Sequence, residues 1–336
     1  MNLSPVIKDI GRGAAGARSM SQELARDTLA QVLAGQVDDL QLGALLIALR
    51  MKGESLDEIA GFLQAVHARC ARLHSPTPVV LIPSYNGSRR LCNLTPLLAM
   101  LLAQEGVPVL VHGQMKDPTR VTSAAIFHDL GLTCLDIRPA QGADPVHGAK
   151  LGAQAWAPVF DSWSRREPAF FSTASLCPEL QTLLDRRWQL GLRNAGHTVA
   201  KMLNPVQGSR SLRLVNFTHP EFGALMQQWV QRDSADTMLL RGTEGEPVAD
   251  PRRQPRIDSY IAGLPCAAAS CAAHEGVLAE LPLLPRTNDA ASTAVYVQAV
   301  LSGERPAPTP VLRQVELVLA AVAALHSADH DLEKTA

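Results

Sequence analysis

The feature that most constrains the fold is a change near Pro78, where helical periodicity gives way to short β-rich runs separated by helical stretches. The runs at 79–82 and 109–111 flank a helical pattern over 93–104. Alternation of this kind is typical of a mainly parallel sheet with helices on its faces, so the sequence predicts an α/β fold. Further elements are expected as strands at 133–137, 212–217 and 238–241 and as helices at 123–130, 178–190, 220–231 and 311–325.

The segment before this α/β part has helical spacing. Leucines recur three and four positions apart between Leu42 and Leu49, and Ser19 with Gln22 predicts a capping box. The interval between the strands expected near 137 and 212 is mostly helical. We therefore expect a small helical domain over residues 1–74, joined by helices from about 178–203, and a larger α/β domain over residues 75–336.

Composition limits the classes of protein to which the chain can belong. With 336 residues, 46% of them hydrophobic and 19% charged, it is long and apolar enough for a large core. The net charge of −1 means that any nucleic-acid binding must depend on a local basic patch. The N-terminal residues lack a signal-peptide pattern, and no apolar stretch extends to the ~20 residues of a membrane helix, so we expect a soluble cytoplasmic protein without a membrane partner.

Several common sites are excluded or disfavoured by their motifs. Gly11, Gly13 and Gly16 match the dinucleotide-binding fingerprint by letter, but they precede a helical domain and do not follow a core strand, so a glycine turn is expected there. The phosphate-binding Walker loop, His-Glu-x-x-His and Gly-x-Ser-x-Gly are absent. The six cysteines have no zinc-site spacing, which predicts buried, reduced thiols.

Two clusters of basic residues each have two interpretations. The segment 185–214 carries six lysines and arginines against one acid, either as a solvated helix face or as a phosphate site for arginine forks. Trp188 within it is either a core residue or a surface for base stacking. The cluster at 252–256 ranks lower, because Asp250 and Asp258 can neutralise it.

Two further pairs of basic residues follow expected strands. Arg89 and Arg90 lie between the first strand and the next helix, and Lys116 and Arg120 follow the second strand. Strand-to-helix turns of α/β sheets attract anions through free backbone N–H groups and the helix dipole. We expect these two loops to face one cleft.

The chain resembles the anthranilate phosphoribosyltransferases and their pyrimidine phosphorylase relatives. The resemblance begins with Ala48-Leu49-Arg50-Met51-Lys52-Gly53-Glu54-Ser55 and continues through Asn93-Leu94-Thr95, His112-Gly113, Gly191-x-Arg193 and Asn204-Pro205. Within this glycosyltransferase family 3 it is most similar to the YbiB-type branch. That similarity is carried by Gly11-Arg12-Gly13, Ile82-Pro83-Ser84-Tyr85-Asn86-Gly87, Asp117-Pro118-Thr119-Arg120, Arg193-Asn194, His197-Thr198, Ala200-Lys201 and Arg241-Gly242-Thr243-Glu244-Gly245-Glu246.

The resemblance also shows what the chain has lost. Where those enzymes hold pyrophosphate in a Gly-Thr-Gly-Gly-Asp loop, this chain has the run from Pro83 to Gly87. Val111 replaces a lysine, and Pro247 and Val248 fall where the enzymes have a metal-binding Asp-Glu pair. Because magnesium prefers oxygen ligands and transfer needs the leaving pyrophosphate stabilised, we expect no metal, no other cofactor and no catalytic residues.

The YbiB-type resemblance implies a homodimer, formed through the N-terminal helices, that binds DNA or RNA with low sequence specificity along a basic groove. The residues expected to bind nucleic acid are Arg89, Arg90, Lys116, Arg120, Arg186, Arg187, Arg193, His197 and Lys201. The residues expected to form the ancestral substrate cleft are Ser84, Asn86, Gly87, Asn93, Thr95, His112, Gly113 and Glu244.

Two other functions remain open at this point. One is a phosphoribosyltransferase with an altered substrate, in which His112, His197 and Glu244 are the candidate acid–base groups. The other is a degenerate scaffold that binds another protein.

Overall fold

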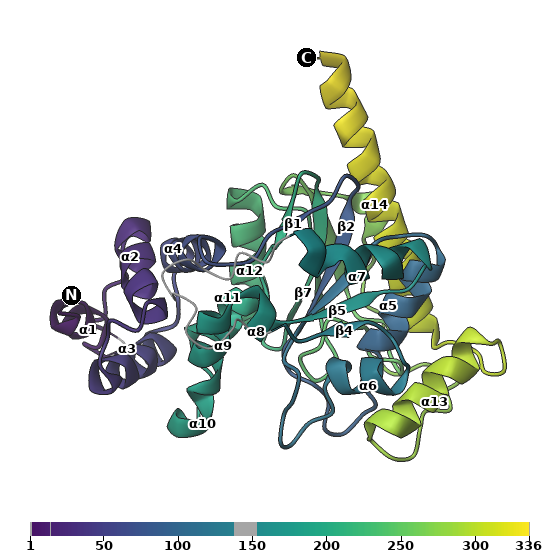
Figure 1. Cartoon of the computed structure of the whole chain (residues 1–336), viewed down its shortest axis with the longest axis horizontal. Coiled ribbons are helices and arrows are strands. Elements are labelled where there is room, and N and C mark those ends of the chain that lie inside the picture. The colour runs from purple at the N-terminus through teal and green to yellow at the C-terminus, as the bar shows by residue number, and fades with distance from the viewer. Residues whose placement is uncertain (1, 14, 138–152, 336) are drawn as a thin grey trace. The chain divides into compact units, whose positions relative to one another are not determined.

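The computed structural model describes residues 2–13, 15–137 and 153–335, with side chains to residue 327 (Figure 1). The described chain forms two compact units. Among the described residues, the first comprises 2–13, 15–72, 137 and 173–205, and the second comprises 73–136, 153–172 and 206–335.

The first unit is helical. Its elements are α1 (Ser4–Ile10), α2 (Gln22–Leu33), α3 (Asp39–Lys52), α4 (Leu56–His67), α8 (Thr173–Leu176), α9 (Pro178–Asp185), α10 (Arg187–Leu190) and α11 (Ala195–Ala200). The predicted capping box at Ser19 is wrong, because Ser21 caps α2 by accepting from the Leu24 N–H. A capping box does form at α4, between Ser55 and Glu58.

Glu58 connects the first helices of this unit although its side chain is buried. Its carboxylate accepts from the Met20 N–H at 3.0 Å and from Lys52 Nζ at 2.6 Å. A buried carboxylate is tolerated only when it is paired and hydrogen-bonded, and Glu58 meets both conditions. The segment before α2, the end of α3 and the start of α4 are thereby held together.

The second unit contains an eight-stranded sheet in the order β10-β9-β8-β7-β2-β3-β5-β4. The six strands from β8 to β4 are parallel to their neighbours, and β9 and β10 add an antiparallel edge. A two-stranded parallel sheet pairs β1 with β6. The bounds are β1 (Leu73–His74), β2 (Val79–Ser84), β3 (Val109–Gly113), β4 (Cys134–Leu135), β5 (Ala169–Ser172), β6 (Val206–Gln207), β7 (Ser211–Phe217), β8 (Thr237–Arg241), β9 (Ile257–Ile261) and β10 (Leu264–Pro265).

Helices cover both faces of this sheet (Figure 1). On one face α5 (Thr95–Gln104), α6 (Ser123–Asp129), α13 (Ala290–Leu301) and α14 (Thr309–Thr335) pack together over the central strands. The short 3-10 helix η1 (Ala267–Ala269) packs against α14 and β9. On the other face, as right-handed crossovers require, α7 (Ala153–Ser164) packs on β5 and α12 (Pro220–Arg232) on β7 and β8.

The predicted α/β class with a mainly parallel sheet is confirmed, but several elements were missed. The interval between 137 and 212 contains the strand β5, whose four residues are too few to show a period. The helix expected at 178–190 is broken at Arg186 and ends at Gly191, which adopts the left-handed conformation. The helix α13 and the edge strands β9 and β10 were not anticipated either, whereas α7 lies in the interval expected to be mostly helical.

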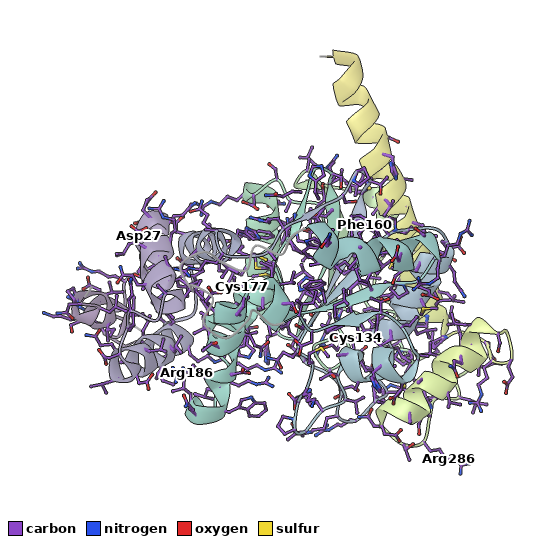
Figure 2. All side chains as sticks on the ribbon, in the orientation of Figure 1. Asp27, Cys134, Phe160, Cys177, Arg186 and Arg286 are labelled. Carbon is purple, nitrogen blue, oxygen red and sulfur yellow. The ribbon has the colours of Figure 1, made fainter. Side chains whose placement is uncertain are left out.

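Two predictions about chemical environment can be compared with the structure. All six cysteines, which lie within the described residues, are free, but three of them are only half-buried; Figure 2 labels Cys134 and Cys177. In the described part of the chain, residues 309–327 of α14 are long and apolar enough to cross a membrane by length and composition. Because Val311, Val318 and Leu325 of that helix are fully buried in the sheet's core, we treat α14 as a core helix.

Candidate functional site

The candidate site lies in the second unit, where three parallel strands end. β2 ends at Ser84, β3 at Gly113 and β8 at Arg241, so the segments that follow them meet at the carboxyl edge of the sheet. Ligands of open α/β sheets bind at this edge. The two segments that dominate the site are the loop between β2 and α5, which we call the β2 loop (residues 85–94), and the turn after β8, which we call the β8 turn (residues 242–248).

Glu246 of the β8 turn fills the start of the β2 loop. Its side chain is 1% exposed, and one carboxylate oxygen accepts from the backbone N–H groups of Asn86 and Gly87, each at 2.7 Å. The other oxygen accepts from the hydroxyls of Ser84 at 2.5 Å and Thr95 at 3.3 Å. Paired backbone N–H groups beside hydroxyls are what an anionic ligand uses at such a loop, and here the protein's own carboxylate takes them.

Glu244 makes a second set of bonds to the same loop. Its carboxylate accepts from the backbone N–H groups of Arg89 at 2.6 Å and of Arg90 and Leu91 at 2.8 Å. The guanidinium of Arg120 lies 4.0 Å away. Between them the two glutamates bind every backbone N–H from residue 86 to residue 91 except that of Ser88, which donates to the Val121 carbonyl.

Gly245, which lies between the two glutamates, allows the β8 turn to come close to the β2 loop. Glu244 and Gly245 have φ of +52° and +87°, which bends the chain between the two side chains. A Cβ on Gly245 would lie 1.6 Å from the Asn86 side-chain nitrogen, which itself donates to the Gly245 carbonyl at 2.6 Å. Only glycine fits this position, so the β8 turn and the β2 loop are matched in shape as well as in hydrogen bonding.

Beneath the carboxylates lies a buried polar network. Asn93 donates to the Ser123 hydroxyl at 3.1 Å and accepts from the Thr95 N–H at 3.1 Å, and the hydroxyls of Ser84 and Ser123 are hydrogen-bonded at 2.7 Å. These side chains come from β2, the β2 loop and the first turns of α5 and α6. Because their hydrogen bonds are satisfied within the protein, the network rigidifies the site.

His112 lies at the end of β3 and is buried. Its Nδ1 is 3.0 Å from the Tyr85 hydroxyl, and the two rings meet edge to face with centroids 5.6 Å apart. Burial lowers the pKa of His112 to about 3, so the imidazole is neutral at pH 7. A base with so low a pKa is poorly matched to acid–base catalysis near neutrality, which weakens the role considered for His112.

The predicted cations of the second unit lie around the β2 loop. Arg89 and Arg90 are exposed, and the described residues supply neither guanidinium with an ion-pair partner. Arg120 donates to the Gly87 carbonyl at 3.2 Å, which ties it to the same loop. Lys116 is exposed in the segment after β3. Three of the four predicted residues are therefore brought to one loop.

The predicted cations of the first unit are less available. Arg186 pairs with Asp39 at 3.1 Å, and Arg187 is 7% exposed with its guanidinium 4.1 Å from the centre of the Trp188 ring. His197 is buried, and its pKa falls to about 3 through burial and the nearby charge of Arg193. Neither Arg187 nor His197 presents a charged group to solvent, whereas Arg193 and Lys201 are half-buried.

The six cations of the segment at 185–214 are divided between the two units. Arg210 and Arg213 belong to the second unit, and the other four cations belong to the first. Arg210 pairs with Asp236, and Arg213 is buried with its guanidinium 4.9 Å from the centre of the Trp229 ring. Their positive charges therefore have structural partners, which the linear sequence could not show.

Glu246 was the important residue that sequence reasoning missed. Counting from Arg241-Gly242 assigned the enzymes' acidic pair to Pro247 and Val248, both of which are buried. The carboxylate of Glu246, one position before this pair, was therefore not predicted to have a role. The signal available was two glutamates alternating around a glycine directly after a strand. Among the described residues no group of three or more His, Cys, Asp or Glu side chains could hold a metal ion.

Comparison with known proteins identifies the lineage of this fold. Residues 4–70 match the helical bundle domain of the glycosyl transferase family. The chain is 36% identical to uncharacterized protein YbiB of Escherichia coli K12, over 96% of this chain and 94% of YbiB. It is 26% identical to an anthranilate phosphoribosyltransferase of Bradyrhizobium, over 66% of this chain and 58% of that enzyme.

Solved structures agree on the fold. Anthranilate phosphoribosyltransferase from Thermus thermophilus superimposes with a TM-score of 0.65 at 20% identity, over 97% of this chain and 96% of that one. The Saccharomyces cerevisiae enzyme, solved in complex with PRPP and Mg, also gives 0.65, at 14% identity, over 96% of this chain and 87% of that one. The chain belongs to the YbiB-type branch of glycosyltransferase family 3, whose fold is that of the anthranilate phosphoribosyltransferases.

Proposed function

We propose that this protein binds DNA or RNA through phosphate contacts, without sequence preference, and does not transfer phosphoribosyl groups. The observation that carries the proposal is the occupation of the β2 loop by Glu246. The donors that a pyrophosphate would need at Asn86 and Gly87 are bound to an internal carboxylate, while Arg89 and Arg90 two positions further on remain exposed.

The arrangement suits a polyanion better than a small phosphorylated substrate. Glu244 holds the backbone of Arg89 and Arg90, so two flexible guanidinium groups extend from a fixed loop. Arginine forks bind phosphate oxygens bidentately, and an exposed pair can follow a strand whose phosphates are evenly spaced. Lys116 and Arg120 supply two further positive charges in the segment between β3 and α6.

The remaining predicted residues contribute unequally to the proposal. In the helical unit Arg186, Arg193 and Lys201 are retained as phosphate contacts, and Arg187 and His197 are assigned supporting roles because they are buried. Assembly of two copies through the N-terminal helices and a cytoplasmic location are also part of the proposal. Analytical ultracentrifugation tests the assembly: a single species at the mass of one chain would contradict it.

A comparison of two double variants tests the strand-binding proposal. Arg89→Ala with Arg90→Ala removes the exposed pair, and Arg286→Ala with Arg305→Ala removes two exposed arginines near α13 (Figure 2 labels Arg286). Fluorescence anisotropy of a labelled single-stranded oligonucleotide should show weaker binding for the first variant and unchanged binding for the control. Equal affinities of the first variant and the parent would contradict the proposal.

The second candidate function is phosphoribosyl transfer to an altered acceptor. It is favoured by the named relatives, several of which are anthranilate phosphoribosyltransferases, and by retention of Asn93, Thr95 and His112-Gly113. Transfer would require Glu246 to leave the donors that it now occupies. Incubation with PRPP, Mg²⁺ and anthranilate, followed by measurement of pyrophosphate release, separates the two functions: release above a protein-free control supports transfer.

A further inference from the structure

A pocket next to the site is lined with arginines. It has a volume of about 830 Å³ and lies within the second unit, at the carboxyl ends of the adjacent strands β7 and β8 and beside the β2 loop. Its arginines come from three separate segments. They are Arg90, Arg241, Arg252, Arg253 and Arg256.

The charges of this pocket are unbalanced. Arg252 makes a two-pronged pair with Asp250 at 3.0 and 2.9 Å, and Arg256 pairs with Asp258 at 2.9 Å. Arg253 shares the Asp250 carboxylate with Arg252, and its Nε lies 3.6 Å from a carboxylate oxygen. Arg90 and Arg241 have no ion-pair partner among the described residues.

The one other lining carboxylate, Glu244, offsets only part of this surplus. Glu244 is committed to three backbone N–H groups of the β2 loop. The exposed guanidinium groups of Arg90 and Arg241, and in part that of Arg253, are therefore available to an anionic ligand. An arginine excess of this kind favours phosphate over a single carboxylate, since several forks can share its oxygens.

The pocket also has an apolar side. Phe217 ends β7 directly opposite Arg241 in the sheet register, and Leu91 and Pro255 complete the apolar lining nearby. A volume of about 830 Å³ is far more than one phosphate needs and falls in the ~300–1,000 Å³ range of organic-ligand pockets. An aromatic ring beside arginines suits a ligand that carries both a flat base and phosphates.

We infer that this pocket binds the phosphate and base of a nucleotide, supplied either by a free nucleoside diphosphate or by the phosphorylated end of a strand. The pocket does not include the backbone donors of Asn86 and Gly87 that Glu246 occupies, so a nucleotide can bind without displacing Glu246. Arg90 is shared with the strand-binding function proposed above, and the strand-end source rests on that function, but Arg241 and Arg253 belong to the pocket alone and allow it to be tested separately.

Calorimetric titration with adenosine 5′-diphosphate, with adenosine as the comparison, tests the free-nucleotide source. The parent protein should bind the diphosphate and not adenosine. Arg241→Ala with Arg253→Ala, two exposed positions, should weaken binding at least tenfold, whereas Arg286→Ala should change it by less than twofold.

The strand-end source is tested with two oligonucleotides that differ only in a 5′-phosphate. If the pocket holds a strand end, the phosphorylated form binds at least fivefold more tightly, and Arg241→Ala with Arg253→Ala abolishes the difference. The inference is overturned if the parent protein neither binds the diphosphate nor distinguishes the two oligonucleotides, or if the double variant leaves both results unchanged. Equal binding of both oligonucleotides by the parent and the variant leaves strand binding intact, so the two proposals fail separately.

Discussion

At the scale of single residues, the site is defined by carboxylates that act as internal anions. Glu246 makes four hydrogen bonds with donors of β2, the β2 loop and α5, and Glu244 makes three with the backbone further along the loop. An internal carboxylate can thus hold the loop in shape, because an acidic side chain supplies the negative charge that an anionic ligand would otherwise bring.

Removing the Glu246 carboxylate should destabilise the protein. Glu246→Ala leaves the Asn86 and Gly87 N–H groups and two hydroxyls without their buried acceptor, and we expect a loss of about 3 kcal/mol in the free energy of unfolding. Urea denaturation measures the change, with Glu304→Ala at an exposed loop as the control. A loss no larger than that of the control would show that these bonds contribute little.

The same substitution should also create an anion site. With the carboxylate gone, inorganic pyrophosphate can accept from the vacated donors, so it should raise the melting temperature of Glu246→Ala but not that of the parent protein. Thermal unfolding with and without millimolar pyrophosphate measures the effect. Equal shifts for both proteins would mean that Glu246 does not control the loop.

The buried histidines predict how stability depends on pH. The pKa values of His112 and His197 fall from 6.5 to about 3 in the folded protein, so between these values the unfolded chain binds more protons than the folded one. Stability is therefore complete above pH 6.5 and decreases as the pH falls towards 3, by about 1.4 kcal/mol per pH unit for each histidine. Urea denaturation between about pH 7.5 and 5 should show a shallower decrease for His112→Gln than for the parent, and parallel curves would count against a neutral buried His112.

At the scale of elements, the β8 turn positions both glutamates, and Gly245 allows it to approach the β2 loop. Gly245→Ala should destabilise the protein by about 2–3 kcal/mol, because its Cβ would collide with Asn86 in addition to straining a backbone at φ +87°. Gly106→Ala is the matched control, since Gly106 has φ +84° and open space around it and should lose only about 1 kcal/mol. Equal losses of stability for the two variants in urea denaturation would indicate that the expected collision of the new Cβ with Asn86 does not destabilise the protein.

Much of the fold could be predicted at this scale. The fully buried runs of β2 and β3 are each followed by a helical stretch, and this pattern is sufficient by itself to indicate an α/β arrangement. The four residues of β5 and the mixed pattern of β9 carry no comparable signal, because their pairing is decided by neighbouring strands. The site residues of the β2 loop were identified through family motifs. Glu246 was missed because its role depends on a contact with Asn86, 160 positions away in the sequence, which only the folded chain brings together.

At the scale of the whole molecule, the nearly neutral net charge favours binding through local charged contacts over a general attraction to nucleic acid. A protein with a formal charge of −1 has no general attraction to nucleic acid, so binding must come from a few local contacts. Charge counted along the sequence overstated the basic surface, since Arg186, Arg210 and Arg256 pair with acids and Arg187 and Arg213 are buried. The two units are also built from interleaved segments, with residues 173–205 in the same unit as the N-terminal helices.

The salt dependence of oligonucleotide binding tests the central claim most directly. If Arg89, Arg90, Lys116 and Arg120 and the three retained cations Arg186, Arg193 and Lys201 each neutralise one phosphate of a single strand, the logarithm of the association constant should fall against the logarithm of salt concentration with a slope of about −5. Arg89→Ala with Arg90→Ala should reduce the magnitude of that slope by about 1.4, and Arg286→Ala with Arg305→Ala should leave it unchanged. No binding at low salt, or a slope that is the same in all three proteins, would contradict the account.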